Sequence, residues 1–284
     1  MPLADSVKTF ADRLAGRRAP LVNVLRLAGV IGRAGPVRGV GLTLEGQERA
    51  IERAFRGRRL AAVALAINSP GGAPVQCDLI ARRIREAADK RNVPVVAFAE
   101  DIAASGGYWL ACAADEIYAS PSSIIGSIGV ISSGFGFPVM LQRMGIERRV
   151  HTSGVRKGML DPFQPEAAED VDRLKAIQAD VHAEFKIMVR SRRGAKLKAG
   201  EEELFSGAVW SGREAMARGL VDGLGDLRGV MIGRYGDKVR LEMIGARRGW
   251  LQRRLGLGRP AAAGVASELL GALDEWAHWK RFGL

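Results

Sequence analysis

The chain has 284 residues, of which 43 are Lys or Arg and 31 are Asp or Glu, and 47% are hydrophobic. This apolar content is enough to bury a large core, which excludes intrinsic disorder as the main state. Two cysteines, Cys77 and Cys112, are too few for a disulfide-stapled secreted scaffold. The net charge of +12 comes without aromatic interleaving or a zinc motif, so we expect it to serve solubility rather than nucleic-acid binding.

The N-terminal segment carries charges at positions 5, 8, 12, 13, 17 and 18 and has no apolar run of its own. It therefore predicts neither a signal peptide nor an anchor, and the expected location is the cytoplasm. The long uncharged stretch 117–142 is interrupted throughout by serine, glycine and proline. We expect it to form buried strand and loop rather than a membrane helix.

The central part of the chain alternates between strand and helix patterns. Short apolar runs predict strands, and apolar residues at helical spacing predict helices between them. This alternation is typical of an α/β fold with parallel pairing. The predicted strands are 60–68, 93–99, 116–120, 123–132 and 146–152, and the predicted helices are 74–90 and 105–114.

The rest of the chain reads as one long helix followed by smaller elements. Apolar positions at helical spacing predict a helix over 166–193, which Gly194 ends. Short elements follow over 208–236. We expect a helical extension at 1–19, a main domain at 20–246, and a basic linker with an amphipathic helix at 247–284.

Three glycine-rich segments stand out, at 68–72, 104–108 and 126–130. Each alone is typical of a tight turn. The first two share one junction, in which a strand ends, glycines turn the chain and a helix begins. Backbone N–H groups at a helix start can hold a developing oxyanion, and glycine lets a substrate approach the backbone closely.

Ser105 stands at such a junction, where it could cap the helix or act as a nucleophile. A nucleophilic serine needs a base, and none of the three histidines, His151, His182 and His278, has an evident carboxylate to orient it. A lysine can take this role when burial keeps its amine neutral. Lys157 is the candidate, although its spacing alone fits a solvated loop lysine equally well.

Four segments together resemble one enzyme family. They are INSPGG, AEDIAASGGYWLACAADEIYASPSSIIGSIGVI, TSGVRKGMLDPFQP and VWSGREAMARGLVDGLGD, and they span residues 60 to about 232. In this order they resemble the signal peptide peptidase A (protease IV, SohB-like) family of serine peptidases. The resemblance implies an α/β fold built as a ClpP/crotonase-like spiral of ββα units, with a Ser/Lys dyad.

The resemblance also assigns roles to individual residues. Ser105 in ASGGY matches the nucleophile, Lys157 matches the general base, and Ser127 in GSIGV matches the serine that orients the lysine. The backbone N–H groups of Gly106 and of either Gly71 or Gly72 match the oxyanion hole. Asn68 fits a structural turn residue that could steady the oxyanion loop.

The resulting hypothesis is a serine endopeptidase that cleaves short, apolar, unstructured peptides such as signal-peptide remnants. It needs no metal and no organic cofactor, and the resemblance implies a homo-oligomer around enclosed sites. The C-terminal segment could touch the inner membrane or dock on a neighbouring subunit. The alternatives are a crotonase-like acyl-CoA enzyme, which would need a carboxylate in its pocket, and a non-catalytic scaffold or nucleic-acid binder.

Overall fold

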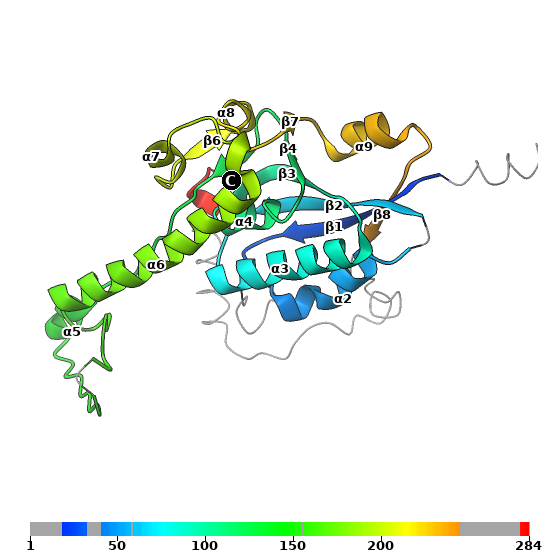
Figure 1. Cartoon of the computed structure of the whole chain (residues 1–284). Coiled ribbons are helices and arrows are strands. Elements are labelled where there is room, and N and C mark those ends of the chain that lie inside the picture. The colour runs from blue at the N-terminus through cyan, green and yellow to red at the C-terminus, as the bar shows by residue number, and fades with distance from the viewer. Residues whose placement is uncertain (1–18, 33–40, 58, 155, 245–278, 284) are drawn as a thin grey trace, which may run out of the picture.

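Figure 1 shows the computed structural model, which describes residues 19–32, 41–57, 59–154, 156–244 and 279–283. Its centre is a sheet with the strand order β6-β5-β3-β2-β1-β8, and β4 and β7 continue from β3 on a second branch. All pairs between named strands are parallel except β5 with β6. The strands are β1 (Leu21–Ala28), β2 (Leu60–Ser69), β3 (Val95–Ala104), β4 (Glu116–Ala119), β5 (Ile124–Gly126), β6 (Val209–Ser211), β7 (Gly223–Leu224) and β8 (Arg240–Ile244).

Helices cover both faces of this sheet. The larger core lies between one face and α2, α3, α4 and the C-terminal half of α6, whereas α9 covers part of the opposite face (Figure 1). None of the helices in the described residues is both long and apolar enough to cross a bilayer. The helices are α2 (Leu44–Ala54), α3 (Pro74–Arg91), α4 (Gly106–Ala111), α5 (Pro138–Arg143), α6 (Ala168–Arg193), α7 (Glu201–Leu204), α8 (Gly212–Ala217) and α9 (Leu227–Tyr235), with a 3₁₀ turn at Gly194–Lys196.

The predicted α/β class with parallel strand pairing is confirmed, with two corrections in detail. The strand predicted over 146–152 is wrong, because this segment is exposed and pairs with no strand. The strand predicted over 123–132 is shorter and ends at Gly126. The predicted helical extensions lie, except for residues 19 and 279–283, outside the described residues, and the domain boundaries stay predictions.

The central strands end together at one edge of the sheet. In the parallel register, Ser69 of β2 lies beside Ala103 of β3, and Ala104 lies beside Gly126 of β5. Most residues of these three strands are buried and apolar, so their register is held by the core on both faces. The segments that leave these strands must therefore meet at the same edge.

The two glycines that begin α4 allow this helix to sit very close to its neighbours. A Cβ added at Gly106 would lie 2.4 Å from the Sγ of Cys77 in α3. A Cβ added at Gly107 would lie 2.3 Å from the backbone oxygen of Ser69 in β2. Any side chain here would push the start of α4, and with it Ser105, away from the sheet edge.

A buried ion pair ties the C-terminal end of α6 to the sheet. The side chain of Arg193 is 2% exposed, and its Nη1 lies 2.6 Å from Oδ2 of Asp222. The same carboxylate accepts a hydrogen bond from the Ile117 N–H of β4 at 2.8 Å and pairs with Lys196 at 2.8 Å. Arg193 also donates to the Gly219 carbonyl. One carboxylate thus joins β4, α6 and the approach to β7.

Replacing Asp222 with Asn should destabilise the fold by about 3 kcal/mol at neutral pH, because it leaves the Arg193 guanidinium buried without its counter-charge. Burial raises the pKa of Asp222, but hydrogen bonds from Arg193 and Lys196 outweigh it, and the pKa lies below its ordinary value. A carboxyl with a lowered folded pKa stabilises above its unfolded value of about 3.9 and loses this contribution as pH falls through the folded value. The free energy of unfolding, measured with urea, should therefore differ less between D222N and wild type below about pH 4 than at neutral pH. An equal difference at pH 7 and pH 3 would contradict this, and D237N, at an exposed carboxylate, is the control.

The close approach of Gly106 to Cys77 predicts that a substitution at Cys77 can restore stability lost by a substitution at Gly106. Gly106→Ala should lower the free energy of unfolding by about 1–3 kcal/mol through overpacking against Cys77. Adding Cys77→Ala removes the obstructing sulfur, so the double variant should be more stable than additivity of the two single changes requires. Gly107→Ala is the matched control, because its obstruction is the Ser69 backbone, which Cys77→Ala cannot relieve. Additive losses at Gly106 and Cys77 would refute the contact.

Candidate active site

Ser105 sits at the turn between β3 and α4 in an unusual backbone conformation. Its φ of 51° and ψ of −122° lie outside the regions that L-residues ordinarily adopt. The turn is held by the Ser105 N–H, which donates to the Gly126 carbonyl at 2.8 Å, and by the Ser105 carbonyl, which accepts from Trp109 N–H at 3.0 Å. Strain of this kind persists where the surrounding structure enforces it, and it is concentrated at functional sites.

Ser127 lies at the equivalent point of the next strand. Because Ala104 and Gly126 are register partners, Ser105 and Ser127 leave adjacent parallel strands side by side. Ser127 also has a positive φ, 52°, and its N–H donates to the Ala208 carbonyl at 2.7 Å. The structure therefore brings together two of the residues that the sequence motifs single out.

The loop after β2 completes the same edge. Ile31 N–H donates to the Gly71 carbonyl and the Ala73 N–H donates to the Ile31 carbonyl, both at 2.8 Å. In a parallel ladder the residue between two such partners directs its own N–H to the opposite side. Gly72 is that residue, and it lines the same cavity as Ser105. Its φ of 146° is one that glycine adopts readily.

Two amides flank the nucleophile position. A Cβ placed on Gly71 would lie 2.8 Å from the Ser105 Cβ and 2.9 Å from the Gly106 nitrogen, so this loop touches the start of α4. The Gly71 N–H donates to the Ser69 hydroxyl at 3.2 Å. Among hydrogen bonds between described residues, the N–H groups of Gly72 and Gly106 have no acceptor. This favours Gly72 over Gly71 as the second donor of an oxyanion hole.

The residues before these glycines secure the loop. The buried Ser69 hydroxyl donates to the Gly29 carbonyl at 2.7 Å and accepts from Gly71, which links the ends of β1 and β2. Ser69 was not predicted to be a functional residue, although its place in INSPGG is a usable signal. Asn68 donates to the Asp101 carboxylate at 2.8 Å, which agrees with its interpretation as a structural residue of this loop.

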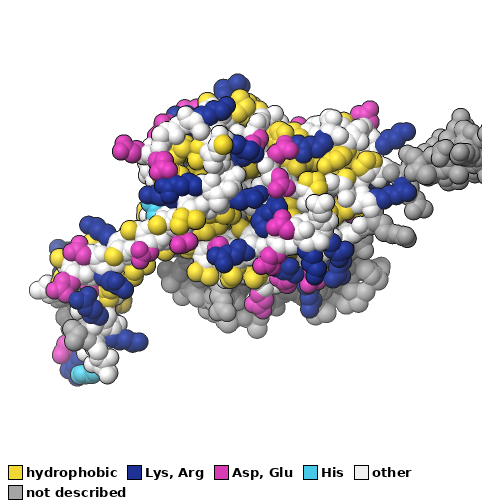
Figure 2. All heavy atoms as spheres, viewed as in Figure 1, with side chains coloured by type: hydrophobic (Ala, Val, Ile, Leu, Met, Phe, Trp, Pro, Cys, Tyr) yellow, Lys and Arg dark blue, Asp and Glu magenta, His cyan; other side chains and the backbone are white. Residues whose placement is uncertain are grey.

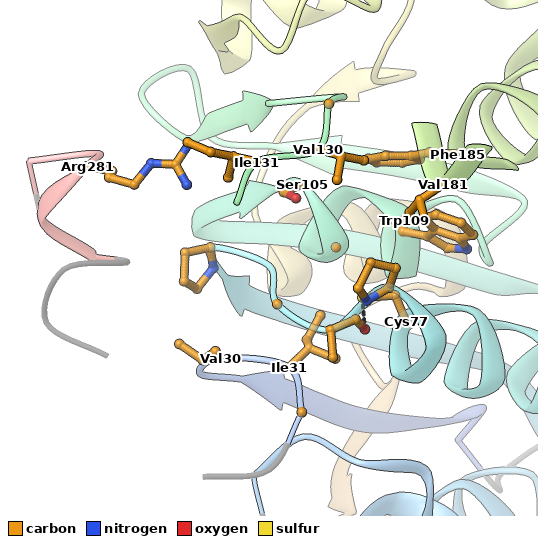
Figure 3. A pocket seen from close by; sticks show the side chains of 17 residues that line it. Val30, Ile31, Cys77, Ser105, Trp109, Val130, Ile131, Val181, Phe185 and Arg281 are labelled. Carbon is orange, nitrogen blue, oxygen red and sulfur yellow. Dashed lines mark hydrogen bonds between the residues drawn. The ribbon is translucent and has the colours of Figure 1, made fainter. Parts of the chain in front are cut away.

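A cavity of about 370 Å³ opens beside Ser105 (Figure 3). Trp109, Val181 and Phe185 form its wall on one side, and the Trp109 and Phe185 rings stack with centroids 4.7 Å apart. Val30, Ile31, Val130 and Ile131 extend the apolar lining. An extended apolar peptide segment is the type of ligand that such a lining accommodates.

Lys157 does not line this cavity. It lies exposed in a segment, here called the arm (residues 131–154 and 156–165), that projects from the sheet with α5 and the first turns of α6 (Figure 1). The preceding residue, Arg156, pairs with Glu169 at the beginning of α6, whereas Val181 of the same helix lines the cavity. Glu169 and Val181 are twelve positions apart, which corresponds to about 18 Å of helix. Within one chain the structure does not bring Lys157 to Ser105.

The histidines are not placed as bases either. His182 lies near the site, but its Nε2 is 3.2 Å from the Ile128 carbonyl, and burial together with Lys186 lowers the pKa of this imidazole. Its ring is thus occupied with backbone groups. His151 is exposed on the arm, and His278 lies outside the described residues.

Cys77, which lines the cavity, is not an evident nucleophile. Burial raises the pKa of its thiol to about 12, and the thiol donates to the Ala73 carbonyl. Burial likewise raises the pKa of Cys112 to about 12. Both remain protonated at neutral pH and act as small apolar groups. Across the described residues, no three His, Cys, Asp or Glu side chains form a metal-binding group.

Comparison with known proteins identifies the family of this chain. The model of peptidase family S49 matches residues 87–232, just over half of the chain. The chloroplastic serine protease SPPA of Arabidopsis thaliana is 30% identical over 230 residues, which are 78% of this chain and 33% of that protein. A relative from Synechocystis that carries a protease name is 30% identical over 253 residues, 86% of this chain and 89% of the relative.

Another similar protein has a different name. The Na(+)/H(+) antiporter NhaA of Brucella abortus is 50% identical over 272 residues, which are 93% of this chain and 37% of that protein. The chain therefore spans about a third of the length of some curated relatives it matches. The family match, which includes Ser105, Ser127 and Lys157, confirms the predicted resemblance: the chain belongs to peptidase family S49, a family of serine peptidases.

Proposed function

We propose that this chain is a serine endopeptidase in which Ser105 is the nucleophile and Lys157 the general base. The observation that carries the proposal is the strained turn of Ser105, which lies at the edge of an apolar cavity beside the N–H groups of Gly72 and Gly106, for which the described residues supply no acceptor. Among the described residues that line this cavity there is no carboxylate, whereas the crotonase-like alternative would require one.

The reaction follows from this arrangement. The Ser105 hydroxyl attacks the scissile carbonyl while a neutral lysine amine takes its proton. The Gly72 and Gly106 N–H groups stabilise the oxyanion, and the lysine ammonium then protonates the leaving amine. Water attacks the resulting acyl-enzyme by the same route and releases Ser105. In this proposal Ser127, which leaves the strand next to that of Ser105, orients the lysine.

The apolar cavity lining supports short, unstructured, apolar peptides as substrates, and signal-peptide remnants are of this kind. The site lies at the carboxyl ends of β2, β3 and β5, and an extended peptide presents its backbone and side chains to such a cavity without tertiary structure of its own. Substrates should therefore be peptides or unfolded segments.

We further propose that Lys157 acts on the Ser105 of a second copy of the chain. In one chain the arm carries Lys157 away from its own cavity (Figure 1). Hydrophobic side chains also run along the arm and α6 in Figure 2, and Phe135 is 82% exposed. Contiguous exposed apolar side chains are typical of surfaces that another protein covers. The exposed apolar residues of the arm are Ile131, Phe135, Val139, Met140, Met144, Ile146, Val150 and Phe163.

A complementation experiment tests the dyad and its arrangement together. Ser105→Ala and Lys157→Met should each abolish peptide hydrolysis, because each removes one member of the dyad. Co-expression of the two variants should restore up to about a quarter of the wild-type activity. If the two variants mix at random in the assembly, the chance that a site has an intact Ser105 is one half, and the chance that the neighbouring copy supplies an intact Lys157 is also one half. About a quarter of the sites then have both groups.

Lys175→Met, at an exposed lysine of α6, is the control and should retain full activity. Full activity of Lys157→Met would exclude Lys157 as the base, and activity of Ser105→Ala would exclude Ser105 as the nucleophile. Two inactive variants that never complement, although size-exclusion chromatography shows that they co-assemble, would place both groups of the dyad in one chain.

A further inference from the structure

The cavity at Ser105 has two unlike sides. Figure 3 shows Trp109, Val181 and Phe185 to one side of Ser105 and the side chain of Arg281 to the other, close to Ile131. Arg281 comes from the segment 279–283, which lies beside the sheet edge although it is distant from Ser105 in sequence (Figure 1). Among the described residues that line the cavity, Arg281 is the one charged side chain.

The Arg281 guanidinium has donors to spare. The guanidinium carbon lies 5.6 Å from the centroid of the Phe282 ring. Within the described part of the chain, Arg281 forms no ion pair. A guanidinium has five N–H donors in a planar fork that matches a carboxylate. A cation that has no ion-pair partner among the described residues, at the rim of an apolar cleft, attracts an anionic group of the molecule that enters the cleft.

We propose that Arg281 is a specificity-determining residue that binds a carboxylate of the peptide substrate, on the opposite side of Ser105 from the apolar wall. The inference rests on the proposed function, because it takes a peptide as the ligand. An unmodified peptide carries carboxylates on Asp and Glu side chains and at its C-terminus, and both have the chemistry that Arg281 recognises. Preferred substrates thus combine an apolar residue on one side of the scissile bond with a carboxylate on the other.

The test measures binding, so it does not depend on catalysis. The full chain with Ser105→Ala is titrated with rhodamine-labelled peptides of one apolar sequence and followed by fluorescence anisotropy. One peptide is neutral, with a Gln and a C-terminal amide. The second has a free C-terminal carboxylate, and a third set keeps the amide and places Glu in turn at each position. The set that gains affinity identifies the source of the carboxylate.

At least one carboxylate peptide should bind about threefold more tightly than the neutral peptide, in the range of a partly exposed ion pair. Arg281→Gln should remove this preference, Arg281→Lys should retain part of it, and 0.5 M salt should reduce it. Arg228→Gln, at an exposed arginine of α9, makes the same charge change away from the cavity and should leave the preference intact.

Equal binding of all peptides, a preference that survives Arg281→Gln, or no binding of any peptide would each overturn the proposal. The proposed function is judged separately, by cleavage of the same peptides with the Ser105 enzyme. Cleavage of neutral and carboxylate peptides at the same kcat/KM would leave the peptidase proposal standing and reject the role of Arg281. In the active enzyme, Arg281→Gln should raise KM for the preferred peptide more than it lowers kcat.

Discussion

The site depends on the parallel register of β2, β3 and β5, which end at one edge of the sheet. Ser105 N–H donates to Gly126 at the end of the neighbouring strand, and this hydrogen bond holds the serine in a backbone conformation that an isolated turn would not adopt. The register in turn depends on strands that are buried on both faces. The energy stored in the Ser105 turn is thus offset by the core, and the nucleophile stays where two amides can reach its substrate.

A second constraint is the length of α6. This helix has 26 residues, or about 39 Å, and one end packs on the core while the other supports the arm. The buried Arg193–Asp222 pair anchors the core end. The helix holds the arm away from the cavity of the same chain, and among the described residues that line this cavity there is no base beside Ser105. Under the proposed function, the same geometry presents Lys157 and the apolar arm residues to a second copy of the chain.

The sequence was most informative where local pattern and tertiary role coincide. Ser105 follows a short apolar run and adjoins glycines, so its place at a strand-to-helix junction was predicted from the sequence. The role of Ser127 came only from the family resemblance, and the strand predicted over 123–132 ran past it. The strand predicted over 146–152 was wrong because apolar alternation does not distinguish a strand from an arm that exposes Ile146 and Val150. The position of Lys157 could not be predicted, because the order of motifs along the chain does not give the distance between Lys157 and Ser105 in the folded structure. Arg281 belongs to no sequence motif, and only its place in the lining of the cavity points to a role.

The central claim is that Ser105 is the nucleophile, and covalent labelling tests it most directly. A peptide-based phosphonate with an apolar residue beside its reactive phosphorus should transfer the phosphonyl group to a serine hydroxyl as its leaving group departs. Mass spectrometry of digested protein should then show one adduct, on Ser105, that appears as peptide hydrolysis is lost. An adduct on another residue, or complete inhibition with Ser105 unmodified, would contradict the account.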